Sequence, residues 1–256
     1  MNGTLSRADR ALLFVPLAGG LVFGILPFFA QQAFATAAGY SGADAYVYRL
    51  AGAATVGYAV ALALGILDRV WADLRWVVLA TLAFNVVSIV ACAIEIARGR
   101  AQPVVYLSLA ASIVIVAITT RLLLAHGVAR PARDVAGWIV WLIAVATIAA
   151  TVFGILPLFP AYAATFGYAG TDTFVFRQAG AATLGYAVMG FAELRALRWN
   201  ELRLPTVMAL VFNGLAFVAS LIELATRGVT LLDALVAPAS LLLTVVFAIA
   251  LARRGR

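Results

Sequence analysis

Long apolar runs separated by short polar segments extend along the whole chain of 256 residues. A helix needs about 20 mostly apolar residues to cross a bilayer, and eight runs meet that length. These runs cover about Ala11–Ala33, Ala45–Leu67, Arg75–Ala97, Val104–Leu124, Val135–Phe159, Thr173–Leu194, Leu204–Ala225 and Leu231–Ala252. The connections between them are short, which is typical of antiparallel neighbours in a helical bundle. The pattern therefore predicts an all-α polytopic membrane protein with eight transmembrane helices.

The composition excludes a soluble protein of this length. Apolar residues make up 65% of the chain and charged residues only 11%, whereas a soluble domain is about half apolar and about a quarter charged. The first apolar run is longer than the core of a cleaved signal peptide, so we interpret it as a retained first span.

Reactive side chains are scarce, which limits the chemistry that the chain could perform. All 18 basic residues are arginine, and without lysine there is no Schiff base to a cofactor and no P-loop. One histidine, His126, and one cysteine, Cys92, do not suffice for a haem or metal site or for a disulfide within the chain. We therefore expect no cofactor, no metal and no enzymatic activity, with a lipid-modifying membrane enzyme as the alternative. His126 is expected to be solvated in an Arg-rich loop.

The net charge of +7 follows the predicted topology. With eight spans, both termini share one side of the membrane with most of the arginines. That side holds Arg7, Arg10, Arg69, Arg75, Arg121, Arg130, Arg133, Arg195, Arg198, Arg203, Arg253, Arg254 and Arg256, and the other side holds Arg49, Arg98, Arg100, Arg177 and Arg227. Because Arg-rich loops face the cytoplasm, we expect both termini to be cytoplasmic in the plasma (inner) membrane. We interpret the charge as a topology signal and expect no nucleic-acid partner. The Lys-free, Arg- and Ala-rich usage is typical of a GC-rich bacterial genome.

The two halves of the chain repeat one sequence pattern. The matching segments are Phe23–Pro27 with Phe153–Pro157, Ala38–Ala59 with Phe166–Ala187, and Phe84–Ala97 with Phe212–Ala225. The second pair is identical at 14 of 22 positions and the third at 7 of 14, at a spacing of 128 residues. We therefore predict two tandem four-helix transmembrane repeats, 1–128 and 129–256. Because four spans return the chain to its starting side, the repeats should be parallel and related by a pseudo-two-fold axis along the membrane normal, like a fused homodimer.

Eight polar residues present in both halves are predicted to gather at the outer side of the membrane. They are Tyr40, Asp44, Arg49 and Glu95, with the counterparts Tyr168, Asp172, Arg177 and Glu223. The two aspartates directly precede a helix, so we expect them to cap it or to bind an ion or ligand. If the second and third spans form a hairpin, Arg49 reaches Glu95, and the matching pair forms in the second half. Such a pair either clasps the hairpin or lines a pocket whose arginine binds an anionic group.

A stripe of small polar residues is predicted deeper in the membrane. Its members are Asn85, Ser88, Asn213 and Ser220, and Tyr58 and Tyr186 lie at similar depth. Residues three or four apart share one helix face, and such a stripe marks either close helix packing with interhelical hydrogen bonds or a path for substrate or water. The two tyrosine hydroxyls each require a partner.

Small residues and prolines shape the predicted helices. Gly57 and Gly185 belong to the repeated pattern and should let helix backbones approach closely. Pro27 and Pro157 lie near the outer ends of the first and fifth spans, where we expect them to kink or end the helix.

The layout of each half, with a Gly-rich and Arg-containing segment at the start of its second helix, resembles the small four-helix bacterial membrane families of the DoxX-like kind. The resemblance implies a four-helix unit and assigns no functional residue.

These observations favour an accessory or structural component of a membrane complex, or a binder of small amphiphiles. Its partners would be membrane lipids, other membrane-protein subunits or a small amphiphilic ligand. The alternative is a small transporter or channel with a path between the repeats, lined by Asn85 and Asn213. A transporter should have a polar cavity on the pseudo-two-fold axis, whereas an accessory protein should have a dry centre.

Overall fold

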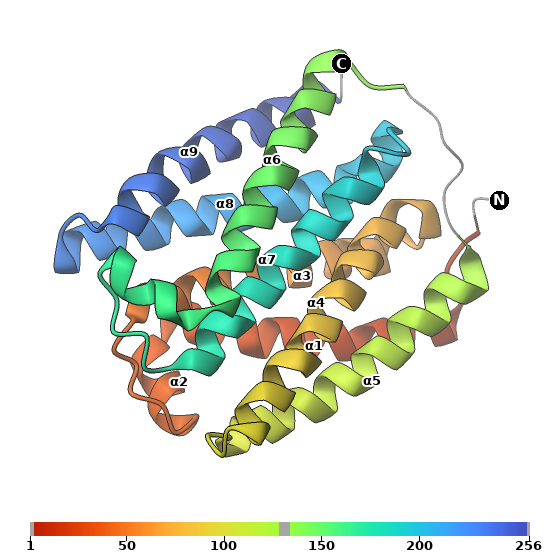
Figure 1. The fold of residues 1–256 in the computed structure, drawn as a ribbon. Coiled ribbons are helices and arrows are strands. Elements are labelled where there is room, and N and C mark those ends of the chain that lie inside the picture. Colours follow the sequence, from red (N-terminus) through yellow and green to blue (C-terminus); the bar gives the residue numbers. More distant parts are fainter. Residues whose placement is uncertain (1–2, 128–133, 255–256) are drawn as a thin grey trace.

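The computed structural model describes residues 3–127 and 134–254, which form a bundle of helices (Figure 1). Seven helical segments in these ranges are long and apolar enough to cross a membrane, so the protein is a multi-pass membrane protein, as the sequence predicts. They are α1 (Arg7–Phe29), α3 (Ala45–Asp68), α4 (Trp71–Ala97), α5 (Pro103–His126), α6 (Gly137–Ile155) continued by η1 (Leu156–Leu158), α8 (Trp199–Arg227) and α9 (Leu231–Ala252). The predicted boundary between residues 128 and 129, with Arg130, Arg133 and Arg256, lies outside the described residues.

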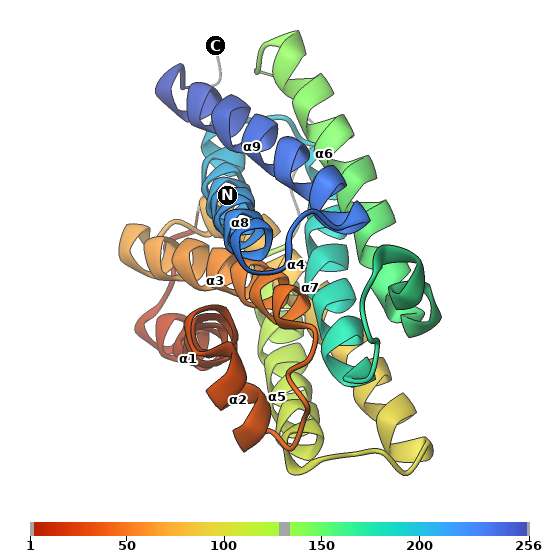
Figure 2. The ribbon, with the colours of Figure 1, turned by 90° about the vertical axis from the view of Figure 1, so that its left-hand side faces the viewer.

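The helix α7 (Thr173–Glu193) corresponds to the sixth predicted span but is not one of these seven. Arg177, Gln178 and Glu193, together with several glycines, make it less apolar than the others. It packs against α4 and α6, and many of its residues are buried (Figure 2). A helix surrounded by protein tolerates polar residues because these face the bundle interior rather than lipid.

Short helical segments follow the two repeated prolines. The helix α1 ends two residues after Pro27 and is followed by α2 (Gln31–Ala37), while α6 ends two residues before Pro157 and is followed by η1 and η2 (Pro160–Phe166). The expected effect of the prolines is confirmed, and the short segments that follow them were not predicted.

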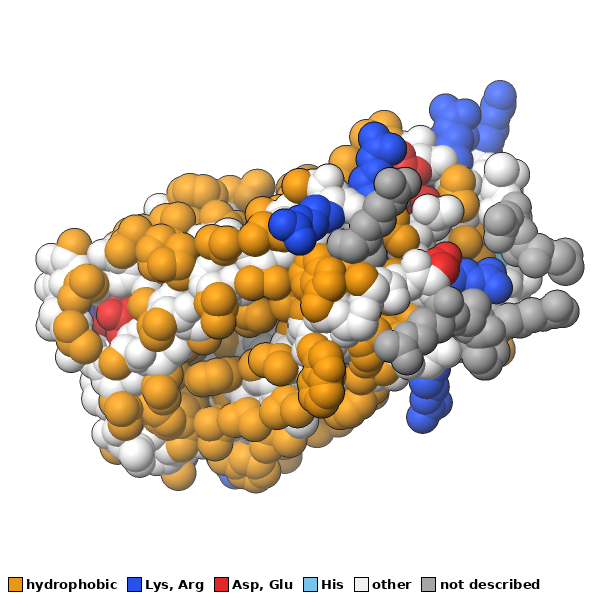
Figure 3. All heavy atoms as spheres, turned by 90° about the horizontal axis from the view of Figure 1, so that it is seen from above, with side chains coloured by type: hydrophobic (Ala, Val, Ile, Leu, Met, Phe, Trp, Pro, Cys, Tyr) orange, Lys and Arg blue, Asp and Glu red, His pale blue; other side chains and the backbone are white. Residues whose placement is uncertain are grey.

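The bundle has two distinct ends (Figure 1). Both termini and the turns between α3 and α4 and between α7 and α8 lie at one end, while α2, η2 and the turns between α4 and α5 and between α8 and α9 lie at the other. Most of the charged side chains visible in Figure 3 gather at the end with the termini, and the surface over the remaining length is mostly apolar. This distribution is typical of a protein that crosses a bilayer.

Helices from the two halves of the chain interleave (Figures 1 and 2). The helix α3 packs along α1 and α8, and α7 packs along α6 and α4, whereas α3 and α4 contact each other much less. Arg69 has a positive φ of 62° and turns the chain sharply between α3 and α4. The expectation of a packed hairpin from the second and third spans is therefore wrong.

Glycines allow α3 and α7 to pack closely against helices of the other half. A Cβ atom at Gly57 would lie 2.8 Å from the carbonyl oxygen of Met208 in α8, and one at Gly185 would lie 2.7 Å from that of Ala80 in α4. The backbones touch at these points, as expected of small residues in membrane helices. Because the partners lie in the other half, this close packing draws α3 away from α4.

Candidate functional site

Asp172, at the end of the bundle opposite the termini, is held by the loop before α3. Its carboxylate accepts hydrogen bonds from the backbone N–H groups of Ser41 at 3.1 Å and Gly42 at 2.8 Å. The hydroxyls of Ser41, at 3.0 Å, and Tyr48, at 2.9 Å, donate two more. Both carboxylate oxygens are thus occupied by donors from the first half of the chain, and the side chain is buried.

Asp44 makes the matching contact in the opposite direction. It accepts hydrogen bonds from the backbone N–H groups of Ala169 and Gly170, both at 2.8 Å. Although the two aspartates occupy the N-cap positions of α3 and α7, neither side chain bonds to its own helix, so the expected capping is wrong. Gly42 and Gly170 have positive φ angles of 70° and 64°, a conformation in which successive N–H groups converge on an anion. Each loop therefore binds the aspartate of the other.

A buried ion pair at the same end also joins the two halves. Glu95 of α4 pairs with Arg177 of α7, and the hydroxyl of Thr173 donates to Glu95 at 2.8 Å. The two charged side chains are only 2% and 3% exposed. The expected pair of Glu95 with Arg49 is wrong, because α4 packs mainly on α7 and much less on α3.

Glu223, the residue of α8 that matches Glu95, has fewer polar partners than Glu95. Glu223 is fully buried, and neither of its carboxylate oxygens has a hydrogen-bond partner among the described residues. It forms an ion pair with Arg227 at 3.6 Å, from a side chain that is 40% exposed. Ala45 stands where the second half has Thr173, so the hydroxyl that serves Glu95 has no counterpart here. The arginine expected to pair with Glu223 is engaged by Glu95 instead.

Two tyrosines and Arg49 complete the predicted outer cluster. The Tyr168 hydroxyl hydrogen-bonds to that of Thr230 at 3.1 Å, and Tyr40 lines a cavity described below. Burial raises the pKa of both tyrosine hydroxyls, so they are protonated at neutral pH. Arg49 is half-buried. Because most charges of the cluster are bonded across the two halves, its geometry favours a structural clasp over an open binding site.

Two tyrosines fill the centre of the bundle, where α3 packs against α7. Tyr58 donates to the carbonyl oxygen of Ala182 and Tyr186 to that of Ala54, both at 2.8 Å. The rings meet edge to face, with centroids 5.0 Å apart. These bonds identify the partners that the tyrosines require. Within the described ranges, these rings occupy the centre, and each also lines one of two lateral cavities, Tyr186 the first and Tyr58 the second.

Two cavities lie beside this centre. Cavity 1, of about 150 Å³, is lined mainly by α6, α7, α8 and α9, with contributions from α3, η1 and η2. Cavity 2, of about 110 Å³, is lined mainly by α1, α3, α4 and α5, with contributions from α2 and α7. Asn213 lines cavity 1 and Asn85 lines cavity 2, so the two asparagines face different spaces rather than a common path. Matching lining residues 128 positions apart are Thr55 and Thr183, Ala111 and Ala239, and Ser112 and Ser240. The two cavities thus occupy equivalent places in the two halves.

The serines of the predicted stripe bond to neighbouring helices. Ser88 accepts a hydrogen bond from Ser112 of α5 at 3.0 Å, and Ser220 shares one with Tyr46 of α3 at 2.7 Å. The asparagines instead donate to carbonyl oxygens of their own helices, four residues earlier. Interhelical hydrogen bonds, as in the packing interpretation of the stripe, thus occur at its serines.

Cavity 1 contains a charged residue that the sequence analysis missed. Glu193, the last residue of α7, lines this cavity and is only 5% exposed. The residue 128 positions earlier is Gly65, which packs against Leu74. The predicted site residues occur mostly in both halves of the chain, whereas Glu193 occurs in one half only. The available signal was a lone carboxylate at the end of an otherwise apolar run.

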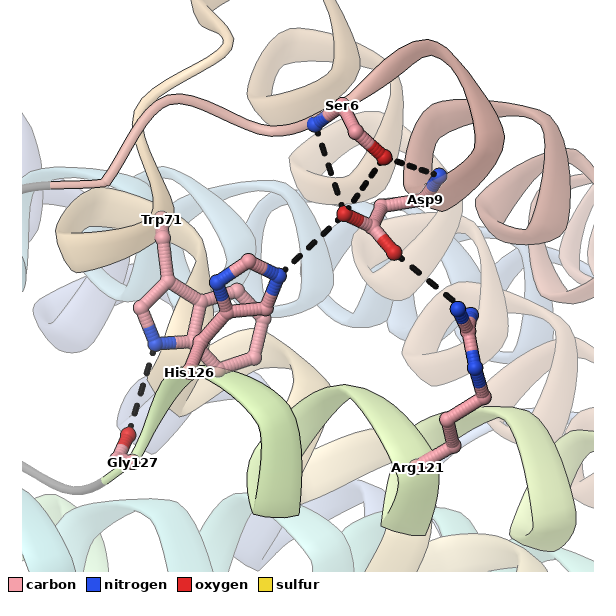
Figure 4. A network of polar contacts seen from close by, with 6 residues as sticks. All are labelled: Ser6, Asp9, Trp71, Arg121, His126 and Gly127. Atoms are coloured by element: carbon pink, nitrogen blue, oxygen red, sulfur yellow. Dashed lines mark hydrogen bonds and ion pairs between the residues drawn. The ribbon is translucent and has the colours of Figure 1, made fainter.

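A polar network near the N-terminus ties α1 to α5 (Figure 4). Ser6 and Asp9 form a capping box at the start of α1, and Asp9 also bonds to His126 at 3.2 Å and to Arg121 at 3.5 Å. The His126 ring packs on that of Trp71, with centroids 4.9 Å apart. The expectation that His126 is merely solvated is wrong, because it ends α5 directly beside this carboxylate.

Ser6→Ala should lower the free energy of unfolding by about 1 kcal/mol, since the serine satisfies a free N–H group of α1 and also donates to Asp9. Denaturant titration of the detergent-solubilised protein measures this change. Thr226→Ala removes an exposed hydroxyl that bonds only within α8 and serves as the control. Equal stability of the two variants would contradict a role for the capping box.

Comparison with protein-family models, with curated proteins and with solved structures finds no match for this chain. The resemblance of each half to DoxX-like families therefore rests on its layout alone.

Proposed function

We propose that the protein is a non-enzymatic accessory component of the bacterial inner membrane that binds small amphiphiles. The observation that carries this proposal is the pair of cavities at equivalent places in the two halves. Their lining is almost entirely apolar, with a few hydroxyl and amide groups, which is the usual make-up of a ligand site. An apolar cavity of about 150 Å³ accommodates a ring of benzene size, so each cavity suits part of a small amphiphile rather than a whole lipid.

In the topology that we propose, α7 also crosses the membrane, which brings the number of spans to eight. Its 21 residues give a helix of about 31 Å, close to the roughly 30 Å of a hydrocarbon core. Its burial between α4 and α6 supports this assignment, because its polar residues then avoid lipid.

We also propose that the two repeats are parallel and related by a pseudo-two-fold axis along the membrane normal. The contacts that occur twice with exchanged roles support this relation: each aspartate binds the other loop, and each central tyrosine bonds to the other half. The interleaving of α3 with α8 and of α7 with α4 is what an intertwined homodimer would retain after fusion.

The end that carries the termini is, in this proposal, cytoplasmic. The described arginines of the predicted cytoplasmic group lie in or beside the turns and helix ends of that side, and the charged end in Figure 3 supports the assignment.

A transport path between the repeats has less support than binding of amphiphiles in the two cavities. Tyr58 and Tyr186 occupy the centre, and their hydroxyls are both satisfied by backbone carbonyls. The space that could receive a ligand lies beside the centre, in the two cavities.

Filling the cavities tests the proposal. We expect wild-type protein, purified from its membrane in a sterol-based detergent that has no alkyl chain, to retain amphiphiles that mass spectrometry identifies. Ala239→Phe should reduce retention in cavity 1 and Ala111→Phe in cavity 2, each by about half of the total, because the ring occupies the space.

The matched control is Val145→Phe, which enlarges an exposed residue of α6 that lines neither cavity. It should retain the wild-type amount. Wild-type protein free of any bound amphiphile, or equal retention by all variants, would contradict the proposal.

A further inference from the structure

Among the described residues that line cavity 1, Glu193 is the single charged one. It is 5% exposed, and its Oε1 atom has no hydrogen-bond partner in the part of the chain that the structure describes. A buried carboxylate oxygen without a donor is costly. The protein therefore presents a strong acceptor to an otherwise apolar space.

The hydroxyl groups of the cavity do not serve this acceptor. Thr147, Thr183 and Thr206 each donate to a carbonyl oxygen four residues earlier in their own helix, at 2.7–2.9 Å. The arginines of the described chain are absent from the lining. Among the described residues, cavity 1 thus holds a carboxyl group without a cation to match it, and its three threonine hydroxyls are engaged elsewhere.

The location of Glu193 strengthens its negative potential. It is the last residue of α7, where the partial negative charge of a helix C-terminus adds to that of the side chain. From Glu193 the lining follows α7 back to Ala179, a distance of about 21 Å along the helix. One end of the cavity is therefore electronegative and the rest is apolar.

We propose that cavity 1 binds amphiphiles with a cationic amine head group. The ammonium donates to the Glu193 carboxylate, and the first part of the alkyl chain lies along α7 towards Ala179. The ammonium favours the ionised form of this buried carboxyl group, whereas a phosphate or carboxylate head group would bring a second anion beside it. This inference rests on the proposed function, since it names the ligand class of one of its cavities.

Cavity 2 provides the internal comparison. In the described part of the chain its lining contains no charged residue, and the residue matching Glu193 is Gly65. Gln178 lines cavity 2 where the matching residue of cavity 1 is Leu50. A preference for amines should therefore belong to cavity 1 alone.

Binding of dodecylamine, dodecanol and dodecyl phosphate to the purified full chain, in a sterol-based detergent, tests this assignment by native mass spectrometry and calorimetry. In the Ala111→Phe background, which leaves cavity 1 open, we expect dodecylamine to bind about tenfold tighter than dodecyl phosphate. Glu193→Gln should weaken binding of dodecylamine about tenfold or more, because the ammonium then meets a neutral amide oxygen in place of a charged acceptor. Its effect on dodecanol should be small.

Asp134→Asn is the matched control, since it removes an exposed carboxylate from the same end of the bundle outside cavity 1, and it should keep the wild-type preference. Equal binding of amine and phosphate by the protein with intact Glu193 overturns the inference, even if Glu193→Gln folds poorly. The proposed function then stands if Ala239→Phe, added to the Ala111→Phe background, abolishes binding of all three probes. Binding of none of the probes to wild-type protein overturns both proposals.

Discussion

Glu95→Ala should lower the free energy of unfolding by about 3–5 kcal/mol, the usual effect of removing one partner of a buried ion pair. Its partner Arg177 is 3% exposed and would be left buried without a counter-charge, and Thr173 would lose its acceptor. Denaturant titration in detergent micelles, followed by tryptophan fluorescence, measures this change.

A double-mutant cycle shows which arginine is the partner. Glu95→Ala and Arg177→Ala should couple strongly, because the second substitution removes the charge that the first leaves unpaired. Glu95→Ala and Arg49→Ala should be additive, since Arg49 is half-buried and lies in a helix that makes little contact with α4. Coupling to Arg49 in place of Arg177 would contradict the interleaved arrangement.

The membrane helices could be predicted from the sequence, because burial in lipid requires long apolar runs and leaves a plain record in the chain. The positions of Pro27 and Pro157 likewise located the ends of α1 and α6. The short segments α2 and η2 were missed, since they are too short for a periodic pattern and depend on packing against the bundle.

The partners of the repeated residues could not be predicted. Arg49 and Arg177 occupy matching positions in the two halves, so the sequence does not distinguish a pair within one half from a pair between halves. The choice depends on which helix faces which, and this follows from the close contacts at Gly57 and Gly185. The same ambiguity affected Asp44 and Asp172, whose side chains were assigned to their own helices.

Residues that differ between the two halves indicate a different role from residues that the halves share. The outer cluster, common to both halves, is mostly engaged in joining them. Glu193 and Leu50 line cavity 1, whereas the residues that match them are Gly65, which is outside the lining of cavity 2, and Gln178, which belongs to that lining, so the two cavities have separate chemistry. A residue shared by the halves is thus a candidate for assembly, and one that differs is a candidate for ligand selection.

Gly185→Ala should lower the free energy of unfolding by about 3 kcal/mol, the upper part of the range for overpacking. The new methyl group would overlap the Tyr58 hydroxyl and would lie 2.7 Å from the backbone oxygen of Ala80. A side chain can rotate away, but the backbone of α4 can move only if the central packing opens. Denaturant titration measures the loss, and Gly57→Ala should behave alike because it meets the Tyr186 hydroxyl and the backbone of α8.

Gly214→Ala separates this effect from helix propensity. A Cβ atom there would meet its nearest neighbour at 3.8 Å, an ordinary contact, so the substitution should be neutral or stabilising. Tyr58→Phe alone should cost about 1 kcal/mol through the lost bond to Ala182. Combined with Gly185→Ala it should recover part of the stability, because the overlapping hydroxyl is gone while the contact with Ala80 persists. Strict additivity of the two substitutions would place Tyr58 away from Gly185 and would contradict the packed centre. The proposal that ligands bind in the two cavities rather than along a central path depends on that packing.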